Sequence, residues 1–194
     1  LNTGVYADLD AIMLTSAATL KAVEGQSPVI SGELCIHVAS EVDGAGIEGL
    51  TFKNIDTKTG GFCETEEDAV IYSEGDNFTF TQNTIDGEAE TLNNSTYHWL
   101  MLKGDAAMVE RNTFANRDKA ENGSVIKMSS SSTNHVIQYN RVENFVTGRR
   151  LMRVQTSGAT IKGNTILNPN GGISLEDGGF NTVSDNIIIR TTDI

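Results

Sequence analysis

The stretch Phe80-Thr81-Gln82-Asn83-Thr84-Ile85 has the form apolar-x-x-Asn-x-apolar, and this form recurs along the chain. Further copies lie at residues 109–114, 137–142, 161–166 and 183–188, with a looser copy at residues 50–55. Their asparagines are Asn54, Asn83, Asn112, Asn140, Asn164 and Asn186, which are 29, 29, 28, 24 and 22 residues apart. A period of this length indicates a protein built from stacked, similar units.

A second short apolar pattern precedes each of the later asparagines. Its copies lie at residues 99–102, 125–128, 151–154 and 173–175. Short strand-like runs separated by Gly, Asn, Asp and Ser, without the 3.6-residue period of a helix, exclude a helical repeat. We therefore predict an all-β parallel β-helix, or β-solenoid, of roughly seven to eight coils with little or no helix, forming one domain over residues 1–194.

An antiparallel β-sandwich is the competing architecture. Asp-Gly and Asn-Gly pairs, such as those at residues 86–87 and 170–171, are typical of hairpin turns. A sandwich would place such turns every 8 to 12 residues or so and would not repeat one asparagine at the longer spacing. The asparagine period therefore favours the coil.

The six asparagines are expected to form a structural ladder. Asparagine tolerates left-handed backbone angles where a coil bends, and amides in successive coils can hydrogen-bond to one another. The alternative is a row of ligands for a substrate or a metal. Apolar neighbours on both sides of each asparagine place the row in or beside the core, which favours the structural role.

Differences in repeat length fall mostly after the asparagine, in loop insertions at residues 56–68, 86–97, 115–123 and 143–149. Insertions at equivalent points of a solenoid emerge along one edge. Acidic residues in the first two insertions could hold Ca²⁺, but they lack the ligand spacing of a calcium loop, so solvated surface charge is favoured. Cys35 and Cys63 are 28 residues apart, one repeat length, and could form a rung-to-rung disulfide; two unpaired core cysteines are the alternative.

Composition excludes several classes of function. The 194 residues include 26 Asp and Glu but only 14 Lys and Arg, giving a net charge of -12, so nucleic acid is not an expected partner. Apolar runs are too short for membrane insertion. An acidic chain with sparse Lys and many Ser, Thr and Asn suits a secreted protein, extracellular or at the cell surface. His37, His98 and His135 show no metal spacing and no recognisable Ser, Cys or Asp partner, which favours structural roles.

Several stretches resemble the β-helical polysaccharide lyases of the chondroitinase-B and alginate-lyase family, whose fold is a right-handed parallel β-helix. They are Val29-Ile-Ser-Gly32, Ile47-Glu-Gly-Leu-Thr-Phe-Lys-Asn54, His98-Trp-Leu-Met-Leu102 followed by Val109-Glu-Arg-Asn112-Thr-Phe114, and Asn134-His-Val-Ile-Gln-Tyr-Asn140. The resemblance covers most of the chain and is more specific for the fold than for the activity.

The resemblance implies proton abstraction beside a uronate carboxylate by a Lys base and an Arg, with Ca²⁺ held by Asn and Glu side chains. Carried onto this sequence, the Lys position holds Thr156, and the Arg strand reads Leu175-Glu176-Asp177-Gly178. Asn140 alone matches a metal ligand, and Glu176 is expected to repel a substrate carboxylate. We therefore expect no catalytic residue, no metal ligand and no cofactor, unless a shift by one coil brings Lys127 or Arg153 into these roles.

The terminal coils carry no recognisable polar cap, and residues 187–194 read as an apolar strand. Solenoid coils are stable only with a neighbour or a cap on each side. These features predict self-association end to end into a filament, and hence a non-catalytic extracellular structural protein. The alternatives are a lyase-like enzyme or a glycan-binding module acting on uronate polysaccharides such as alginate or chondroitin.

Overall fold

The computed structural model describes residues 1–7, 9, 11–57, 63, 69–88, 97–117, 123–145 and 150–191. Its strands form three sheets, here called A, B and C. Sheet A contains β1 (Gly4–Ala7), β4 (Pro28–Leu34), β7 (Thr51–Thr57), β10 (Thr84–Glu88), β13 (Thr113–Arg117), β16 (Arg141–Phe145), β19 (Thr165–Pro169) and β22 (Ile187–Ile189). Sheet B contains β2 (Ile12–Leu14), β5 (Ile36–Val38), β8 (Ala69–Ser73), β11 (His98–Leu102), β14 (Ile126–Met128), β17 (Arg150–Val154) and β20 (Gly172–Leu175). Sheet C contains β3 (Thr19–Lys21), β6 (Gly46–Glu48), β9 (Thr79–Thr81), β12 (Met108–Glu110), β15 (Val136–Gln138), β18 (Thr160–Lys162) and β21 (Thr182–Ser184).

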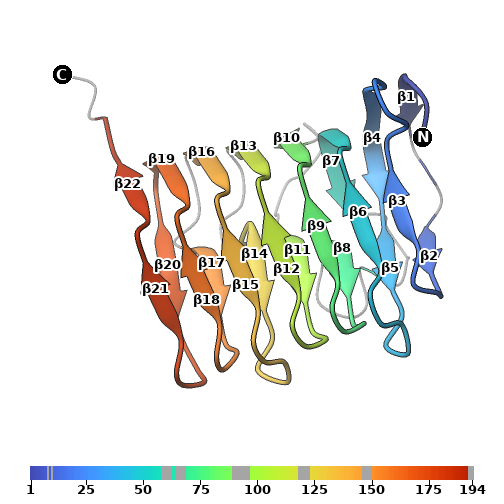
Figure 1. Cartoon of the computed structure of the whole chain (residues 1–194). Coiled ribbons are helices and arrows are strands. Elements are labelled where there is room, and N and C mark those ends of the chain that lie inside the picture. Colours follow the sequence, from blue (N-terminus) through green and yellow to red (C-terminus); the bar gives the residue numbers. More distant parts are fainter. Residues whose placement is uncertain are drawn as a thin grey trace.

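Each coil passes through sheets A, B and C in turn, and every strand pairs in parallel with its counterpart in the next coil. Figure 1 shows the coils following one another along the long axis, with the N-terminal coil at the right and the C-terminal coil at the left. Seven coils with a strand in each sheet, followed by β22, can be traced through the described ranges. The predicted parallel β-helix is therefore confirmed.

The core is a set of apolar columns that run along the axis. Phe52, Ile85 and Phe114 lie above one another in sheet A, because β7, β10 and β13 pair in register. Phe80 in sheet C fills the space between two of them, with its ring centroid 6.2 Å from those of Phe52 and Phe114. Each such buried side chain stabilises the fold by about 1.5–3 kcal/mol, so the columns hold neighbouring coils together.

Five asparagines, all buried except the half-buried Asn186, form a ladder at the corner between sheets C and A. The Oδ1 of each accepts a hydrogen bond from the preceding coil: Asn112 Oδ1 from Asn83 N at 2.8 Å, and Asn140 Oδ1 from Asn112 N at 3.0 Å. Each Nδ2 donates to the carbonyl oxygen of an apolar residue, such as Val109 O for Asn140. The members are Asn83, Asn112, Asn140, Asn164 and Asn186. The ladder thus pairs backbone groups that the corner would otherwise leave unsatisfied.

Asn54 is not part of this ladder, so its assignment from sequence was wrong. The register pairs Thr84 with Thr51, which places Leu50 opposite Asn83, and Leu50 N donates to Asn83 Oδ1 at 2.9 Å. Asn54 instead begins an outer column that is exposed to solvent. Its equivalents are Gly87, Asn116, Asn144 and Asn168, and all five have positive φ. The amides of this outer column also bond between coils, as in Asn144 Nδ2 to Asn116 Oδ1 at 3.0 Å.

The left-handed residue at the C-to-A corner precedes the ladder asparagine instead of being that asparagine. Gln82, Arg111, Tyr139 and Asp185 have φ between 55° and 57°, and Gly163 has a φ of 63°. The inner asparagines are therefore selected for their amide hydrogen bonds and not for their backbone angles. The part of the sequence-based explanation that attributed these asparagines to left-handed backbone angles was therefore wrong.

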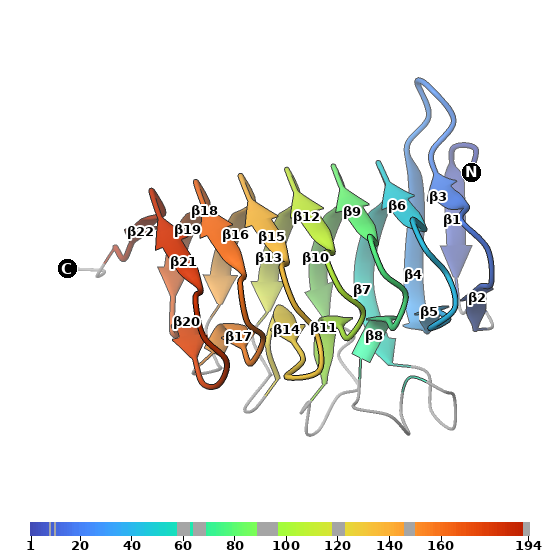
Figure 2. The same ribbon diagram turned by 60° about the horizontal axis from the view of Figure 1, so that its bottom comes forward.

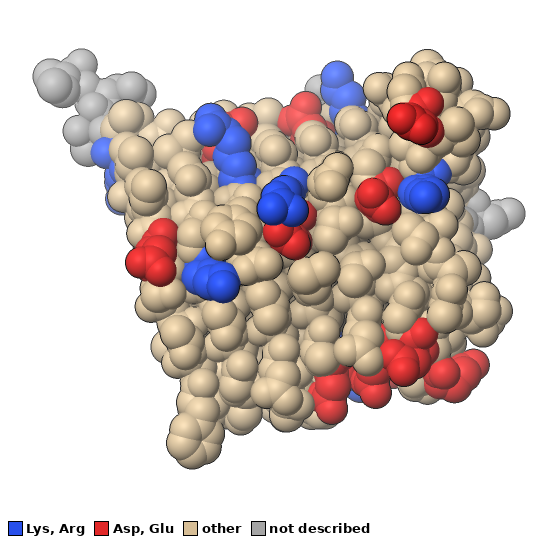
Figure 3. Space-filling model, in the orientation of Figure 1, with Lys and Arg blue, Asp and Glu red and all other residues tan. Residues whose placement is uncertain are grey.

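The turns between sheets B and C carry acidic residues in the early coils. Asp43 and Asp76 are paired across a parallel bridge, and Asp76 Oδ1 accepts a hydrogen bond from Asp105 N at 2.7 Å. Figure 3, in the orientation of Figure 1, shows acidic side chains gathered at the lower right of this face. The loop insertions expected at 56–68, 86–97, 115–123 and 143–149 fall mainly outside the described residues.

We predict that Asn140→Ala will lower the free energy of unfolding by about 3 kcal/mol, because it leaves the buried N–H of Asn112 without its acceptor and removes the amide bonds to neighbouring coils. Asn54→Gly should change this free energy by about 0.5 kcal/mol or less, since glycine adopts the same positive φ. Urea denaturation of the two variants measures the difference. Equal losses would contradict the assignment of Asn54 to the outer column.

Candidate functional site

The outer face of sheet B carries a row of basic side chains in the later coils. Ile126 and Met128 point into the core, so Lys127 between them faces outward, and Lys127 pairs in register with Arg153 of β17. Figure 2 shows the strands of sheet B, from β5 to β20, side by side along the lower edge of the molecule. Coil-to-coil pairing therefore places these two cations at the strand spacing of about 4.8 Å.

Glu176, immediately after β20, joins two arginines of the preceding coil. Arg150 Nε lies 2.8 Å from Glu176 Oε1, and Arg153 Nε donates to Glu176 Oε2. Partial burial raises the pKa of Glu176, but the hydrogen bond from Arg153 and the charges of both arginines outweigh it, so that its pKa is lowered. These two ion pairs offset the negative charge of Glu176 and so weaken the repulsion of a carboxylate that the sequence predicts.

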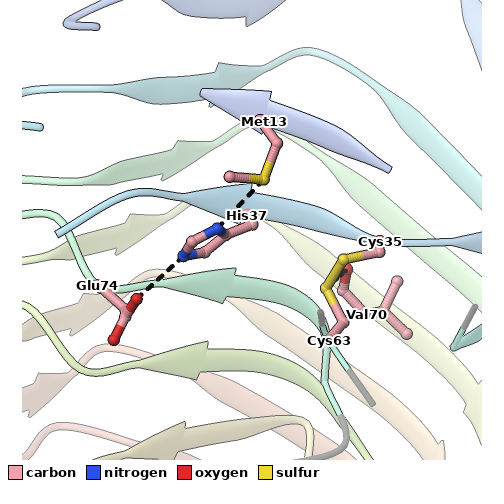
Figure 4. The surroundings of a disulfide bond; sticks show 6 residues. All are labelled: Met13, Cys35, His37, Cys63, Val70 and Glu74. Atoms are coloured by element: carbon pink, nitrogen blue, oxygen red, sulfur yellow. Dashed lines mark hydrogen bonds and ion pairs between the residues drawn. A yellow bond between two sulfur atoms is a disulfide. The ribbon is translucent and has the colours of Figure 1, made fainter. Parts of the chain in front are cut away.

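A second polar cluster lies on the same face in the earlier coils. Lys103 Nζ donates to Tyr72 Oη and to Glu74 Oε1, each at 3.0 Å. His37 Nε2 lies 3.1 Å from Glu74 Oε2, and its Nδ1 lies 3.3 Å from Met13 Sδ (Figure 4). The hydrogen bonds to Tyr72 and Glu74 raise the pKa of Lys103, and burial raises that of Tyr72. Lys103 is therefore a fixed cation at neutral pH and not a ready proton acceptor.

The charge of this face differs in sign from that of the whole chain. We call the outward side chains of β8 to β20, with the residue that follows each strand, the basic face. Its charged members among the described residues are the cations Lys103, Lys127, Arg150 and Arg153 and the carboxylates Glu74 and Glu176. They sum to a charge of +2, on a protein whose net charge is -12. An anionic ligand is therefore attracted to this face in preference to the rest of the surface.

Two residues named by the family resemblance use their side chains in hydrogen bonds within the fold. Thr156 is fully buried, and its hydroxyl donates to the carbonyl oxygen of Ser132. Asn140 is buried in the inner ladder, where both of its amide atoms are hydrogen-bonded, so its expected match to a metal ligand was wrong. Within the described ranges, no group of three or more His, Cys, Asp and Glu side chains could hold a metal ion. The acidic residues 64–68, considered for Ca²⁺, lie outside those ranges.

Sequence reasoning missed Tyr72, Glu74 and Lys103. A usable signal was present, because Glu74 directly follows the strand 69–73 and Lys103 directly follows the strand 98–102. Aligning the ends of these strands would have placed the two opposite charges one coil apart. The early coils were not aligned because their ladder position holds Leu50 in place of asparagine.

The chain matches a family model described as "Right handed beta helix region" over residues 34–193, most of its length. The chain belongs to the right-handed β-helix family. No curated protein sequence matches it.

Solved structures similar to this β-helix include three lyases. One is the complex of the alginate lyase AlyF-OU02 with G6, with a TM-score of 0.72, 19% identity, and coverage of 96% of this chain and 47% of the other. The second is a PL6 alginate lyase in complex with a trisaccharide, with a TM-score of 0.62, 17% identity, and coverage of 97% and 48%. The third is a mannuronic acid specific polysaccharide family 6 lyase from human gut microbiota, with a TM-score of 0.61, 16% identity, and coverage of 97% and 53%.

This similarity is one of fold, because the sequence identities are only 16%, 17% and 19%. The β-helix spans about half the length of the solved structures that it matches. The described part of the chain forms no helix with the length and apolarity needed to cross a bilayer.

A disulfide joins Cys35 to Cys63, with 5.7 Å between their Cα atoms (Figure 4). The rung-to-rung reasoning behind it was wrong, because the register places Val70, and not Cys63, opposite Cys35. The bond instead ties the residue preceding β5 to the segment between β7 and β8. Its surroundings are a small apolar cluster on the outside of sheet B that includes Tyr72 and Met101. The disulfide therefore cross-links two adjacent coils on the outer side of sheet B.

His98 and His135 are buried and paired with serines, which the sequence did not predict. His98 Nδ1 lies 2.8 Å from Ser124 Oγ, and His135 Nε2 lies 2.7 Å from Ser132 Oγ. Burial lowers the pKa of His98 to about 3, helped by the charges of Lys127, Arg117 and Arg153. Burial lowers the pKa of His135 to about 4. Both imidazoles are neutral in the folded protein, as structural histidines within the rungs.

We predict that His135 contributes to acid unfolding. An unfolded histidine binds a proton near pH 6.5, whereas His135 does so only near pH 4, so the unfolded state holds more protons between these values. The free energy of unfolding therefore falls as the pH decreases through this window, by up to about 1.4 kcal/mol per pH unit.

His135→Asn should remove this part of the slope while keeping an acceptor for Ala107 N, as Asn181 does for Ala159 N two coils further on. Urea unfolding at pH 7 and pH 4 measures the slope for both proteins. His135→Ala, which leaves Ala107 N without its acceptor, should lower stability at both pH values. A slope unchanged in His135→Asn would contradict the assignment.

Proposed function

We propose that this β-helix binds an acidic polysaccharide of the uronate class along the outer face of sheet B. The observation that carries the proposal is the basic face itself, a row of cations on a strongly acidic protein. Arginine guanidinium groups recognise carboxylates with two parallel hydrogen bonds, and lysine adds a point charge. Lys127 and Arg153, at equivalent positions of successive coils, suit a polymer that presents one carboxylate after another.

The comparisons support the ligand class. The three similar structures described above are lyases, two of them named as alginate lyases and one as specific for mannuronic acid. Two of them were solved with G6 or a trisaccharide. Alginate is therefore the first polysaccharide to test, and the ion pairs of Glu176 weaken the repulsion that would have opposed it.

Binding without cleavage is the form of the proposal that the side chains favour. A lysine accepts a proton only as the neutral amine, whereas Lys103 is held charged by Tyr72 and Glu74. Thr156 and Glu176 stand where the resemblance expects Lys and Arg, and Thr156 is buried. The disulfide fits a secreted or cell-surface location, because such bonds persist in oxidising compartments.

The double variant Lys127→Gln/Arg153→Gln is expected to bind alginate at least about tenfold more weakly than the native protein, because two cations of the basic face are lost. The matched control is Arg111→Gln/Lys162→Gln, which removes the same charge from the C-to-A corner and from sheet C. Calorimetric titration at two salt concentrations measures both affinities, and binding should weaken at the higher concentration.

The same samples can be followed by ultraviolet absorbance, which detects the double bond that a lyase creates. No increase is expected for the native protein with alginate or chondroitin, with or without Ca²⁺. Equal weakening by both double variants would contradict a site on sheet B. A rising absorbance would show that the basic face belongs to an enzyme.

A second candidate function is end-to-end stacking with another copy of the chain. It is favoured by the apolar residues exposed in the last described coil, namely Val183, Ile187, Ile188 and Ile189. Parallel strands β20, β21 and β22 each pair on one side within the described chain, so a strand of a second copy could add to them.

Stacking predicts sedimentation coefficients that rise with protein concentration. Ile188→Lys should abolish this rise, because Ile188 continues the core column of Ile166 and a lysine there cannot pack against another coil. Alginate binding by this variant should be unchanged. A native protein that sediments as a monomer at all concentrations would eliminate the stacking hypothesis.

A further inference from the structure

Phe180 occupies a backbone position that disfavours a bulky side chain. It lies in the turn between β20 and β21, with a φ of 59°. The equivalent residues of earlier coils also have positive φ and are small or are asparagines: Gly44, Asn77, Ala106, Asn134 and Gly158. Left-handed angles are disfavoured for a residue with a side chain relative to glycine, because its Cβ comes close to the following carbonyl oxygen. Phe180 therefore adopts this backbone angle against its conformational preference.

The Phe180 side chain is also fully open to solvent, with 99% of its surface exposed. The ring is exposed because the residues at this turn position of successive coils point outward. Asn77, Ala106 and Asn134 are exposed too, although each has a coil on both sides. A strained residue that also exposes a large apolar ring is typical of a functional site.

The turn that carries Phe180 is held firmly against the preceding coil. Asn181 Oδ1 accepts a hydrogen bond from Ala159 N at 2.8 Å, and Asn181 Nδ2 donates to Thr156 O at 3.0 Å. On the other side, Gly179 N donates to Ser157 Oγ at 3.1 Å. The ring is thus presented by a fixed backbone, which lowers the entropy cost of binding a ligand.

Phe180 borders a hollow that reaches Glu176 of the basic face. The hollow has a volume of about 300 Å³ and is lined by residues 175–181. Glu176 holds Arg150 and Arg153 at its other side. The residues that line this one depression, at the last described coil of sheet B, therefore include an aromatic ring and a carboxylate paired with two arginines, together with Asp177.

We propose that Phe180 is a stacking platform for a sugar ring of the polysaccharide bound on the basic face. The apolar C–H face of a pyranose packs on the Phe180 ring, while Glu176 accepts hydrogen bonds from sugar hydroxyls and the arginines bind the carboxylate. This inference rests on the proposed function and adds to it a subsite for one sugar unit. The small residues at the equivalent positions of earlier coils confine that subsite to this end of the face.

Phe180→Gly tests the proposal through two readouts that move in opposite directions. The melting temperature should rise by about 2–4 °C, because glycine relieves the left-handed strain. The affinity for oligomannuronate or oligoguluronate should fall about three- to tenfold, because the ring is lost. Phe180→Trp should retain the affinity, and Phe180→Leu, which is apolar but has no ring, should lose it as glycine does.

Comparing these variants distinguishes the proposed Phe180 subsite from polysaccharide binding by the basic face as a whole. Native affinity in Phe180→Gly, together with weaker binding by Lys127→Gln/Arg153→Gln, would overturn the stacking proposal and leave the proposed function in place. A lower melting temperature in Phe180→Gly would overturn it as well, by showing that the ring packs within the fold. Absence of binding by the native protein would overturn both.

Discussion

Backbone hydrogen bonds between successive coils are the interaction on which the rest of the structure depends. They fix the register of all three sheets, so most side chains of the described strands lie directly above their counterparts in the preceding coil, apart from shifts near Gly32 and Arg150. A residue type that recurs in the sequence therefore becomes a column in space. The inner asparagines, the stacked phenylalanines and the cations of sheet B are all consequences of this register. Function then depends on which columns face outward.

The outward columns separate charge on a protein that is acidic overall. Aspartates stack at the turns between sheets B and C in the early coils, while cations accumulate on sheet B in the later ones. The carboxylates of the basic face are held by Lys103 or by two arginines, so they position the cations instead of opposing an anion. A net charge of -12 would repel a polyanion, but the distribution of the charged side chains gives one face the opposite sign.

The recurring asparagine was sufficient to predict the fold, because only a coil explains one buried amide per 22 to 29 residues. It failed at Asn54, which lies four residues beyond the ladder position held by Leu50, since both columns use asparagine for different reasons. The basic face could be predicted only in part. Lys127 and Arg153 stood out in the sequence, but the partners of Glu176 come from a neighbouring coil whose register a single sequence does not fix.

The position of the disulfide could not be derived from the sequence for the same reason, namely that the register between coils was not known. A separation of 28 residues suggested equivalent places in adjacent coils, yet the register sets Val70 opposite Cys35. The role proposed for Phe180 could not be predicted from the sequence pattern, because it depends on the backbone angle of this residue and on the outward direction of its side chain. Both properties follow from the turn and not from the residue.

A crystal structure of the protein with a short oligouronate is the most direct test of binding on sheet B. The account predicts that the sugar chain crosses β14, β17 and β20, with a carboxylate within hydrogen-bond distance of Arg153 or Lys127. An oligosaccharide bound on sheet A or sheet C, with the outer face of sheet B empty, would contradict it.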